Sequence, residues 1–365
     1  MTEKKVSAIG ERALISRLSE IFKAPAGKGG KQEKGKEESP EGKKESPQEL
    51  LVGPGSDDCA VLDLNGEDCL VVTTDMLHRT TDFPEGMTPW QIGWMSAAVN
   101  LSDIASMGAR PTGLLVAIGM PADTEISFFE ELAKGIQACA EFCETPVIGG
   151  DLDTHEELTI TGTALGRVKK NQLLRRSGAK PGDLVCVTGH TGSAGAALEV
   201  LQSKHGGIGR KKASESLIKS LLEPVPRTHE AQKLAASGAV TSMMDTSDGL
   251  AMSLHDLAKV SRVGFKIREN SLPILQEVRD FASSPEKGPE NGPEKLLELA
   301  LYTGGDFELL FTITPERLKK VQNICKLSVI GECTKYEEGI VLESVDGRIQ
   351  PVEQRGYQQL KAESS

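Results

Sequence analysis

Two short, mainly apolar runs with the composition of β-strands flank an Asn-Gly pair, and this pattern predicts a β-hairpin. The runs cover residues 59–64 and 69–74, with Asn65-Gly66 between them. Asn-Gly is the pair most typical of two-residue hairpin turns, because both residues tolerate a positive φ. We therefore expect a two-residue turn at this place.

A long apolar segment further on carries start and stop signals for a helix. Thr88 is a typical N-cap, Pro89 suits the first turn, and Gly108 stands just past the end of residues 90–107. These residues are apolar or small on almost every side. The pattern predicts a buried helix.

Strand-like and helix-like segments alternate along the rest of the chain. Residues 158–167 and 240–244 have the composition of strands, and the apolar spacing from Leu250 onward predicts a helix capped by Thr246 or Ser247. Alternation of this kind predicts an α/β protein with mixed sheets.

Two segments lack the apolar residues needed to form a core. Residues 24–48 hold six Lys, five Glu, five Gly and three Pro, and residues 282–295 have the same character. Such composition does not offset the entropy lost on ordering. We expect a disordered insert at 24–48 and a flexible loop at 282–295.

The remaining length suits two domains. A turn-rich stretch over residues 168–180 precedes a strand-like run at 184–188, so we place the domain boundary there. The predicted domains are 1–170 and 171–350, followed by a tail at 351–365.

The net charge of the chain argues against nucleic acid and anionic membranes as partners. The chain has 365 residues, with 53 acidic against 42 basic side chains and a formal net charge of −11. Binding to nucleic acid or to an anionic membrane surface needs a basic face, and no apolar stretch is long enough to span a bilayer. Without an apolar N-terminal signal, and with seven scattered cysteines, we expect a cytoplasmic protein with reduced thiols.

Candidate chemistry begins at the predicted hairpin. A two-residue turn places Asp58 opposite Thr73 and Asp57 opposite Thr74, next to Asp75. Carboxylates this close repel one another unless a cation lies between them, although acids in solvated turns are also common. Asp and Thr oxygens suit Mg²⁺, whereas Zn²⁺ prefers His and Cys.

Other acids stand at similar places. Asn100 and Asp103 share one face of the apolar helix, and a buried carboxylate needs a cation or several donors. Gly149-Gly150-Asp151 ends a short strand, which by itself is equally consistent with a plain turn. Asp245 and Asp248 flank a helix start, where the dipole favours phosphate.

Several common sites are missing from the sequence. The turn at residues 188–195 lacks the spacing of a dinucleotide loop, and no Gly-x-x-x-x-Gly-Lys-Ser/Thr loop occurs. The six histidines form no Ser-His-Asp or Cys-His pattern. The P-loop and Rossmann interpretations therefore lose support.

The motifs together resemble the thiamine-monophosphate kinases, a family related to aminoimidazole ribonucleotide synthetase and selenophosphate synthetase. The resemblance covers nearly everything outside the two low-complexity segments. It is carried by GSDDCAVLDL (55–64), TTDML (73–77), AVNLSDIASMGARP (98–111), IGGD (148–151), RRSGAKPGD (175–183), DTSDGL (245–250) and GGDFELLFT (304–312).

The resemblance implies a transfer of phosphate from ATP to thiamine monophosphate by direct attack of the substrate phosphate on the γ-phosphorus. It implies several Mg²⁺ ions held by Asp58, Thr73, Thr74, Asp75, Asp103, Asp151, Asp245 and Asp248. It implies ATP contacts at Gly150, Asp151, Arg176 and Ser247, and central catalytic roles for Asp75, Asp103, Arg176 and Asp245. Asp57 lies beside these ligands.

The resemblance also implies substrate contacts and an assembly. Asp82 stands where many relatives carry a substrate-binding His. The substrate-binding acid of a Gly-Gly-Glu-Asp-Tyr-Glu motif corresponds here to Asp306 or Glu308, or is lost. Tyr357 matches an aromatic that stacks on the substrate ring. The implied fold is a two-domain aminoimidazole ribonucleotide synthetase-like fold whose N-terminal sheet pairs with its twin in a homodimer.

Two alternatives share this set of acids. Another ATP-dependent member, such as aminoimidazole ribonucleotide synthetase, is distinguished only by its product. A nucleotide-binding homologue without activity is the second alternative, and the intact set of acids argues against it.

Overall fold

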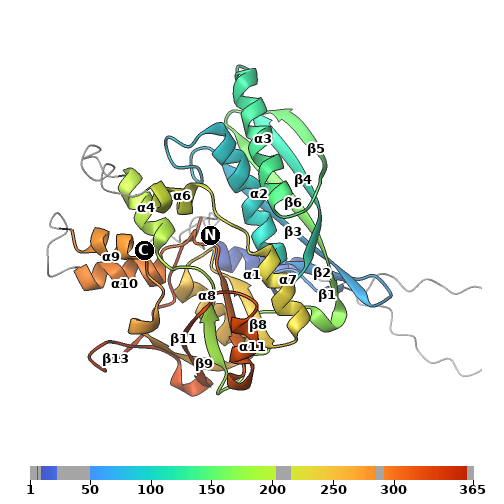
Figure 1. The fold of residues 1–365 in the computed structure, drawn as a ribbon. Helices are drawn as coiled ribbons and strands as arrows, with labels where there is room; N and C mark the ends of the chain where they lie inside the picture. Colours follow the sequence, from blue (N-terminus) through green and yellow to red (C-terminus); the bar gives the residue numbers. More distant parts are fainter. Residues whose placement is uncertain (1–5, 7–9, 23–49, 203–214, 285–291, 360–365) are drawn as a thin grey trace, which may run out of the picture.

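The computed structural model describes residue 6 and residues 10–22, 50–202, 215–284 and 292–359. The stretch 24–48, for which we expected a disordered insert, lies outside the described residues. Within them the strands form one six-stranded sheet and one seven-stranded sheet. Figure 1 shows the first sheet in the upper part of the molecule and the second in the lower part.

The six-stranded sheet belongs to the first half of the chain and has the order β1-β2-β3-β6-β4-β5. Neighbouring strands are antiparallel except for β4 and β5, which run parallel. The strands are β1 (Leu50–Val52), β2 (Ala60–Asp63), β3 (Asp68–His78), β4 (Arg110–Met120), β5 (Val147–Thr154) and β6 (Thr159–Lys169).

Two helices, α2 (Pro89–Ser106) and α3 (Ile126–Phe142), pack against each other and cover one face of this sheet (Figure 1). The predicted start of α2 is confirmed, because Thr88 and Gln91 form a capping box. The two helices approach closely at Gly93, where a Cβ would lie 2.0 Å from the carbonyl oxygen of Leu132. Helix α2 is therefore buried, as its sequence predicted.

The opposite face of the six-stranded sheet is exposed and partly apolar. Along β4 and β6 the even-numbered residues are mostly buried beneath the helices, whereas the odd-numbered ones point the other way. On this open face Met76 is 56% exposed and Leu115 is 36% exposed.

The predicted hairpin is present, but its register differs from our expectation by one residue. Val61 lies opposite Val71 and Asp63 opposite Cys69, so the loop has three residues and the predicted two-residue turn is wrong. Directly opposed residues point to the same face of a sheet. Val61 and Val71 are both fully buried, and only this register places both against the core.

The second half of the chain forms the seven-stranded sheet, in the order β13-β12-β9-β11-β7-β10-β8. Among the described strands of this sheet, only β9 and β12 are parallel neighbours. Its strands are β7 (Leu184–Val187), β8 (Val240–Asp245), β9 (Val263–Arg268), β10 (Leu309–Ile313), β11 (Ser328–Lys335), β12 (Ile340–Glu343) and β13 (Ile349–Pro351). The helices of this half are α4 (Ser193–Gln202), α6 (Glu215–Leu222), α7 (Thr228–Ser237), α8 (Leu250–Ser261), α9 (Gln276–Ala282), α10 (Gly292–Tyr302) and α11 (Leu318–Gln322).

Helix α2 joins the two halves, because it also packs against α7 and β8. The indole nitrogen of Trp94 donates a 2.7 Å hydrogen bond to the carbonyl oxygen of Pro224. At the other end of the helix, the amide of Leu174 in the linker donates to the carbonyl oxygen of Met107 at 3.2 Å. The carboxyl end of α2 thus lies at the boundary between the two sheets.

Two segments at the periphery of the fold are the region around residues 282–295 and helix α1 (Glu11–Ile21). Of the loop expected at 282–295, residues 285–291 lie outside the described residues. The helix α10 already begins at Gly292, and its Lys295 pairs with Glu199. Helix α1 has no buried residue and lies close to α8. No helix in the described ranges is long and apolar enough to cross a membrane. All seven cysteines are free.

Candidate active site

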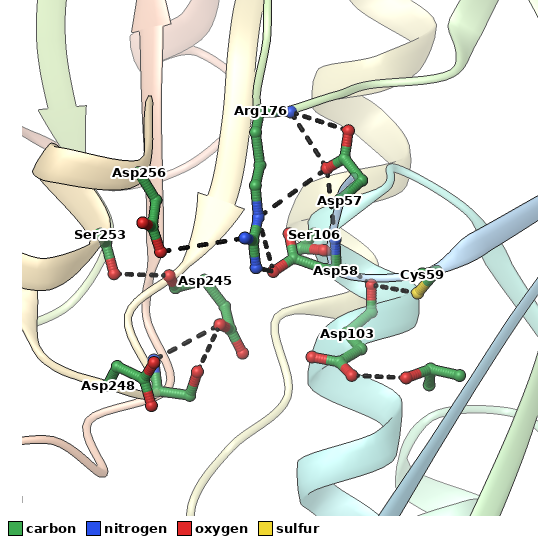
Figure 2. A network of polar contacts seen from close by, with 12 residues as sticks. Asp57, Asp58, Cys59, Asp103, Ser106, Arg176, Asp245, Asp248, Ser253 and Asp256 are labelled. Atoms are coloured by element: carbon green, nitrogen blue, oxygen red, sulfur yellow. Dashed lines mark hydrogen bonds and ion pairs between the residues drawn. The ribbon is translucent and has the colours of Figure 1, made fainter. Parts of the chain in front are cut away.

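Three carboxylates from separate parts of the fold converge on one point. Asp58 comes from the loop before β2, Asp103 from α2 and Asp245 from the end of β8 (Figure 2). One oxygen of each lies within 4.8 Å of those of the other two. We call these three residues the acid cluster. The sequence pointed to each of them separately, and the fold brings them together.

Buried polar side chains on α2 position this side of the site. The hydroxyl of Thr73 on β3 donates a 2.6 Å hydrogen bond to Oδ2 of Asp103. Asn100 is fully buried, and its Oδ1 accepts a 3.1 Å hydrogen bond from the amide of Asp75. The predicted shared face of Asn100 and Asp103 therefore lies against the strand that carries Asp75.

Serine hydroxyls hold Asp245 from both halves of the chain. Ser102 on α2 donates to Oδ2 of Asp245 at 2.6 Å, and Ser247 donates to Oδ1 at 2.9 Å. The expected capping of α8 by Thr246 or Ser247 is wrong, because Gly249 occupies the N-cap position with a φ of 99° and makes no side-chain cap. Ser247 instead serves Asp245, and Asp248 stands at the start of the helix.

Burial and mutual repulsion raise the pKa values of these acids. Burial, followed by the charges of Asp245 and Asp58, raises the pKa of Asp75 to about 6. Burial and the charge of Asp58 raise the pKa of Asp245 to about 6. The pKa of Asp103 is raised well above its usual range for the same reasons, burial first. Ionised acids in this place require a positive charge between them.

The donor set fits a hard divalent cation. Oδ2 of Asp58 is buried and has no hydrogen-bond partner among the described residues, so it is free to bind an ion. The nearest thiol, Cys59, donates its proton to the carbonyl oxygen of Asp103, and burial raises its pKa well above the usual value. Carboxylates without His or thiolate are the ligands that Mg²⁺ prefers.

Arg176 borders the acid cluster. Its guanidinium donates through Nε to Oδ1 of Asp58 at 3.2 Å, and Nη2 contacts the same oxygen. Asp57 has a different role, because it accepts a hydrogen bond from the backbone amide of Arg176 at 3.1 Å and another from Nε of Arg175 at 3.2 Å. Figure 2 shows Asp57 anchoring the linker while Asp58 faces the site.

Thr74 and Asp151 lie on the other side of the sheet. Thr74 follows Thr73 on β3, so it points to the open face, where its hydroxyl lies 3.1 Å from that of Thr163. Asp151 is opposite Ala117 on β4 and is exposed on the same face. Neither side chain reaches the acid cluster within one chain.

The strand register gives the distance across the sheet from Asp75 to β5, the strand that carries Asp151. Asp75, Gly162, Val116 and Gly150 lie opposite one another across four strands. Three strand spacings amount to about 14 Å. A cavity of about 590 Å³ adjoins Gly150 and is lined largely by apolar residues, among them Val116 and Ile136. Gly150 is required there, because a Cβ would lie 1.8 Å from the carbonyl oxygen of Val116.

Asp82 and Tyr357 come close together although they are far apart in the sequence. Asp82 accepts the amide of His78 at 2.7 Å and a hydrogen bond from the side chain of Gln359. The amide of Tyr357 donates to the carbonyl oxygen of Asp248 at 3.0 Å. Burial, followed by the charge of Asp82, raises the pKa of the Tyr357 phenol. These two residues thus lie beside the helix start that carries Asp248.

Asp306 and Glu308 are fully engaged inside the second half. Asp306 accepts the amides of Gly192 and Ala194 at 2.6 and 2.9 Å, at the start of α4. Burial raises its pKa to about 7. Glu308 is 6% exposed and pairs with Arg227 through Nε at 2.7 Å. Neither carboxylate has an oxygen without a protein partner.

Sequence reasoning missed three residues at this site. Ser102 adjoins Asp103 on the apolar helix. Its only signal in the sequence is that a polar side chain stands in a segment predicted to be buried. Arg12 and Asp256 form a bidentate pair although 244 residues separate them, and nothing local in the sequence indicated it.

Comparisons with known proteins show the family to which the chain belongs. The family models described as AIR synthase related protein, N-terminal and C-terminal domain, match residues 56–168 and 180–342. A thiamine-monophosphate kinase of Methanospirillum hungatei is 44% identical to this chain over 73% of the chain and 82% of that protein. The chain belongs to the thiamine-monophosphate kinase family.

Further thiamine-monophosphate kinases support the assignment. That of Escherichia coli is 33% identical over 85% of this chain and 91% of its own length. The solved structure of AaThiL complexed with AMPPCP and TMP superposes with a TM-score of 0.78 at 26% identity, covering 98% of this chain and all of that one. The predicted two-domain fold with mixed sheets is thereby confirmed, as is the resemblance on which it rested.

Proposed function

We propose that this protein transfers the γ-phosphoryl group of ATP to the phosphate of thiamine monophosphate, giving thiamine diphosphate and ADP. The observation that carries the proposal is the acid cluster, in which three elements place carboxylates within 4.8 Å of one another. The names of the thiamine-monophosphate kinases and of the complex with AMPPCP and TMP supply the substrates. All seven cysteines are free, which suits a reducing compartment such as the cytoplasm.

Magnesium would be held by the acid cluster together with Asp75, and Asp248 lies within reach at the start of α8 (Figure 2). When bound, the ions neutralise the charge of the transferring phosphates. Thr73 would support metal binding indirectly, since its hydroxyl donates a hydrogen bond to Asp103. It holds that carboxylate toward the centre of the site.

The remaining task of the chain is to position the two phosphates. Arg176 and Ser247 border the acid cluster and would contact the phosphates of ATP, as would the amino-terminal end of α8. An oxygen of the substrate phosphate then attacks the γ-phosphorus, and the bond to the oxygen of ADP breaks. The oxygen of thiamine monophosphate is already ionised, so no general base is needed.

A second copy of the chain would complete the site. Asp151 lies about three strand spacings, or about 14 Å, from Asp75 and on the opposite face, too far to share an ion with it in one chain. The open face that carries Asp151 and Thr74 also exposes Met76 and Leu115. A homodimer through this face buries those side chains and brings Asp151 toward the partner. Gly150, next to Asp151 on the edge strand β5, would then contact the nucleotide through its backbone.

The substrate end of the site would be formed by Asp82 and Tyr357. Asp82 brings a negative charge to the place where thiamine, which carries a cationic ring, has to bind, and Tyr357 is 45% exposed beside it. Asp306 and Glu308 would act by stabilising the second half of the chain, since protein donors occupy both carboxylates. Replacing Asp82 by Ala is expected to raise KM for thiamine monophosphate and to leave KM for ATP unchanged.

The test is a product assay. Purified protein with ATP, Mg²⁺ and thiamine monophosphate should form thiamine diphosphate and ADP in equal amounts, measured by chromatography. Asp103→Asn should abolish turnover, whereas Asp183→Asn, at a buried aspartate outside the acid cluster, should retain it. If the wild-type protein forms no thiamine diphosphate at any Mg²⁺ concentration, the proposal is wrong.

A further inference from the structure

Helix α1 reaches the phosphate site through one arginine. Arg12 donates through Nη1 and Nη2 to the two oxygens of Asp256 on α8, at 2.7 and 2.9 Å. Its Nη2 also lies 3.7 Å from Oδ2 of Asp248. The hydrogen bond to Asp256 is the chief cause that raises the pKa of Arg12. The pairing is therefore bidentate and charge-assisted, the strongest form of such a contact.

Asp256 in turn faces Arg176. Oδ2 of Asp256 lies 3.9 Å from Nη1 of Arg176, whose other side contacts Asp58 of the acid cluster (Figure 2). Charges thus alternate from Arg12 through Asp256 and Arg176 to Asp58. The carboxylate of Asp256 is 15% exposed, and the bidentate pair fixes its orientation.

Helix α1 buries little apolar surface. None of its residues is buried, and Ile15 and Leu18 are 43% and 47% exposed. Two of its other contacts also lie near the site: Glu11 accepts the amide of Gln359 at 2.9 Å, and Ser19 lies against Gly55 in the loop before Asp57. A helix with so little apolar burial is positioned mainly by its polar contacts.

We propose that Arg12 and Asp256 are positioning residues that orient Arg176 toward the phosphates of ATP, so that helix α1 forms part of the nucleotide site. The inference rests on the proposed function. Asp256 limits the rotation of the guanidinium of Arg176, and Arg12 limits that of Asp256. Without either residue Arg176 keeps its charge but samples more orientations, which weakens its contact with a phosphate.

The experiment measures the affinity of the full-length protein for AMPPCP with Mg²⁺ by calorimetry, together with kcat and KM for ATP. Arg12→Ala and Asp256→Asn are expected to weaken binding of the analogue and to raise KM for ATP, each about tenfold, with a smaller change in kcat. Arg12→Lys should not restore affinity, because a lysine cannot form the bidentate pair. Arg17→Ala on the same helix, at an exposed arginine, is the matched control and should behave like wild type.

A double-mutant cycle separates positioning from other roles. In a chain that already carries Arg176→Ala, adding Arg12→Ala should cause no further loss of affinity, because the residue that it positions is gone. Additive losses would overturn the inference, since they would mean that Arg12 acts directly on phosphate or on folding. So would full affinity in Arg12→Ala, or restoration by Arg12→Lys. Binding of AMPPCP does not depend on the acceptor, so failure of the product assay alone would leave this test valid.

Discussion

Replacing Asp245 by asparagine is expected to stabilise the metal-free protein while removing most of its response to magnesium. Asp245 is 1% exposed, and burial with the charge of Asp58 raises its pKa from 3.8 to about 6. For an acid whose pKa is raised by folding, the stabilising contribution is present at low pH and is lost as pH rises through the folded value. At about 1.4 kcal/mol per pKa unit, the charge of Asp245 opposes folding at pH 7.5 by about 3 kcal/mol.

Hydrogen bonds reduce the expected gain. Ser102 and Ser247 donate to different oxygens of Asp245. Asparagine keeps one acceptor oxygen, so one of these bonds has to be replaced, at a cost of about 1 kcal/mol. The expected net gain is about 2 kcal/mol, which corresponds to a rise of about 3 °C in the Tm of a chain of this size.

Scanning calorimetry at pH 7.5 tests this expectation, first in EDTA and then with Mg²⁺. The matched control is Asp183→Asn, because Asp183 is 4% exposed but accepts hydrogen bonds from the amide of Lys180 and the hydroxyl of Thr241. The control should lose stability in EDTA and keep the full shift caused by Mg²⁺. A variant at Asp245 that is less stable than wild type in EDTA, or that shows the full shift with Mg²⁺, would refute the reasoning.

Three further predictions concern pH, a buried ion pair and a close backbone approach. Because the pKa of Asp75 is raised to about 6, the metal-free protein should have a higher Tm at pH 5 than at pH 7.5, and Mg²⁺ should reduce this difference. Arg227→Ala leaves the carboxylate of Glu308 buried and unpaired, so urea unfolding should show a loss of about 3 to 5 kcal/mol; a loss under 1 kcal/mol would contradict this. Gly150→Ala should weaken binding of AMPPCP, measured by calorimetry, whereas Gly66→Ala, where the new methyl group meets nothing within 4 Å, should not; equal affinities would contradict the steric argument.

The sequence predicted a helix or strand correctly where the interactions that define it lie within that one element. Thr88, Pro89 and Gly108 mark the ends of α2 because capping is a short-range interaction, and the apolar character of the helix predicted its burial. The three aspartates of the acid cluster could also be predicted as site residues, because each stands at a place where an isolated charge is unfavourable. The contacts between them could not be predicted, since they depend on how α2 docks against both sheets.

The errors have a common physical origin in long-range packing. The turn chemistry of Asn65 favoured a two-residue loop, but burial of Val61 and Val71 on one face selected a three-residue loop. Ser247 had the right type for an N-cap, yet Asp245 accepts its hydroxyl. In each case a tertiary contact outweighed a local preference.

The hydrogen bond from Ser102 to Asp245 has a consequence for how the two halves move. It joins a helix of the first half to a strand of the second, at the same point where the acid cluster draws one carboxylate from β8 and two from the first half. An ion bound there is coordinated by both halves at once, so any hinge motion that separates the sheets must also break its coordination. Magnesium would then act mechanically as a cross-link between the two sheets, and the free energy of binding it would add to the free energy of unfolding.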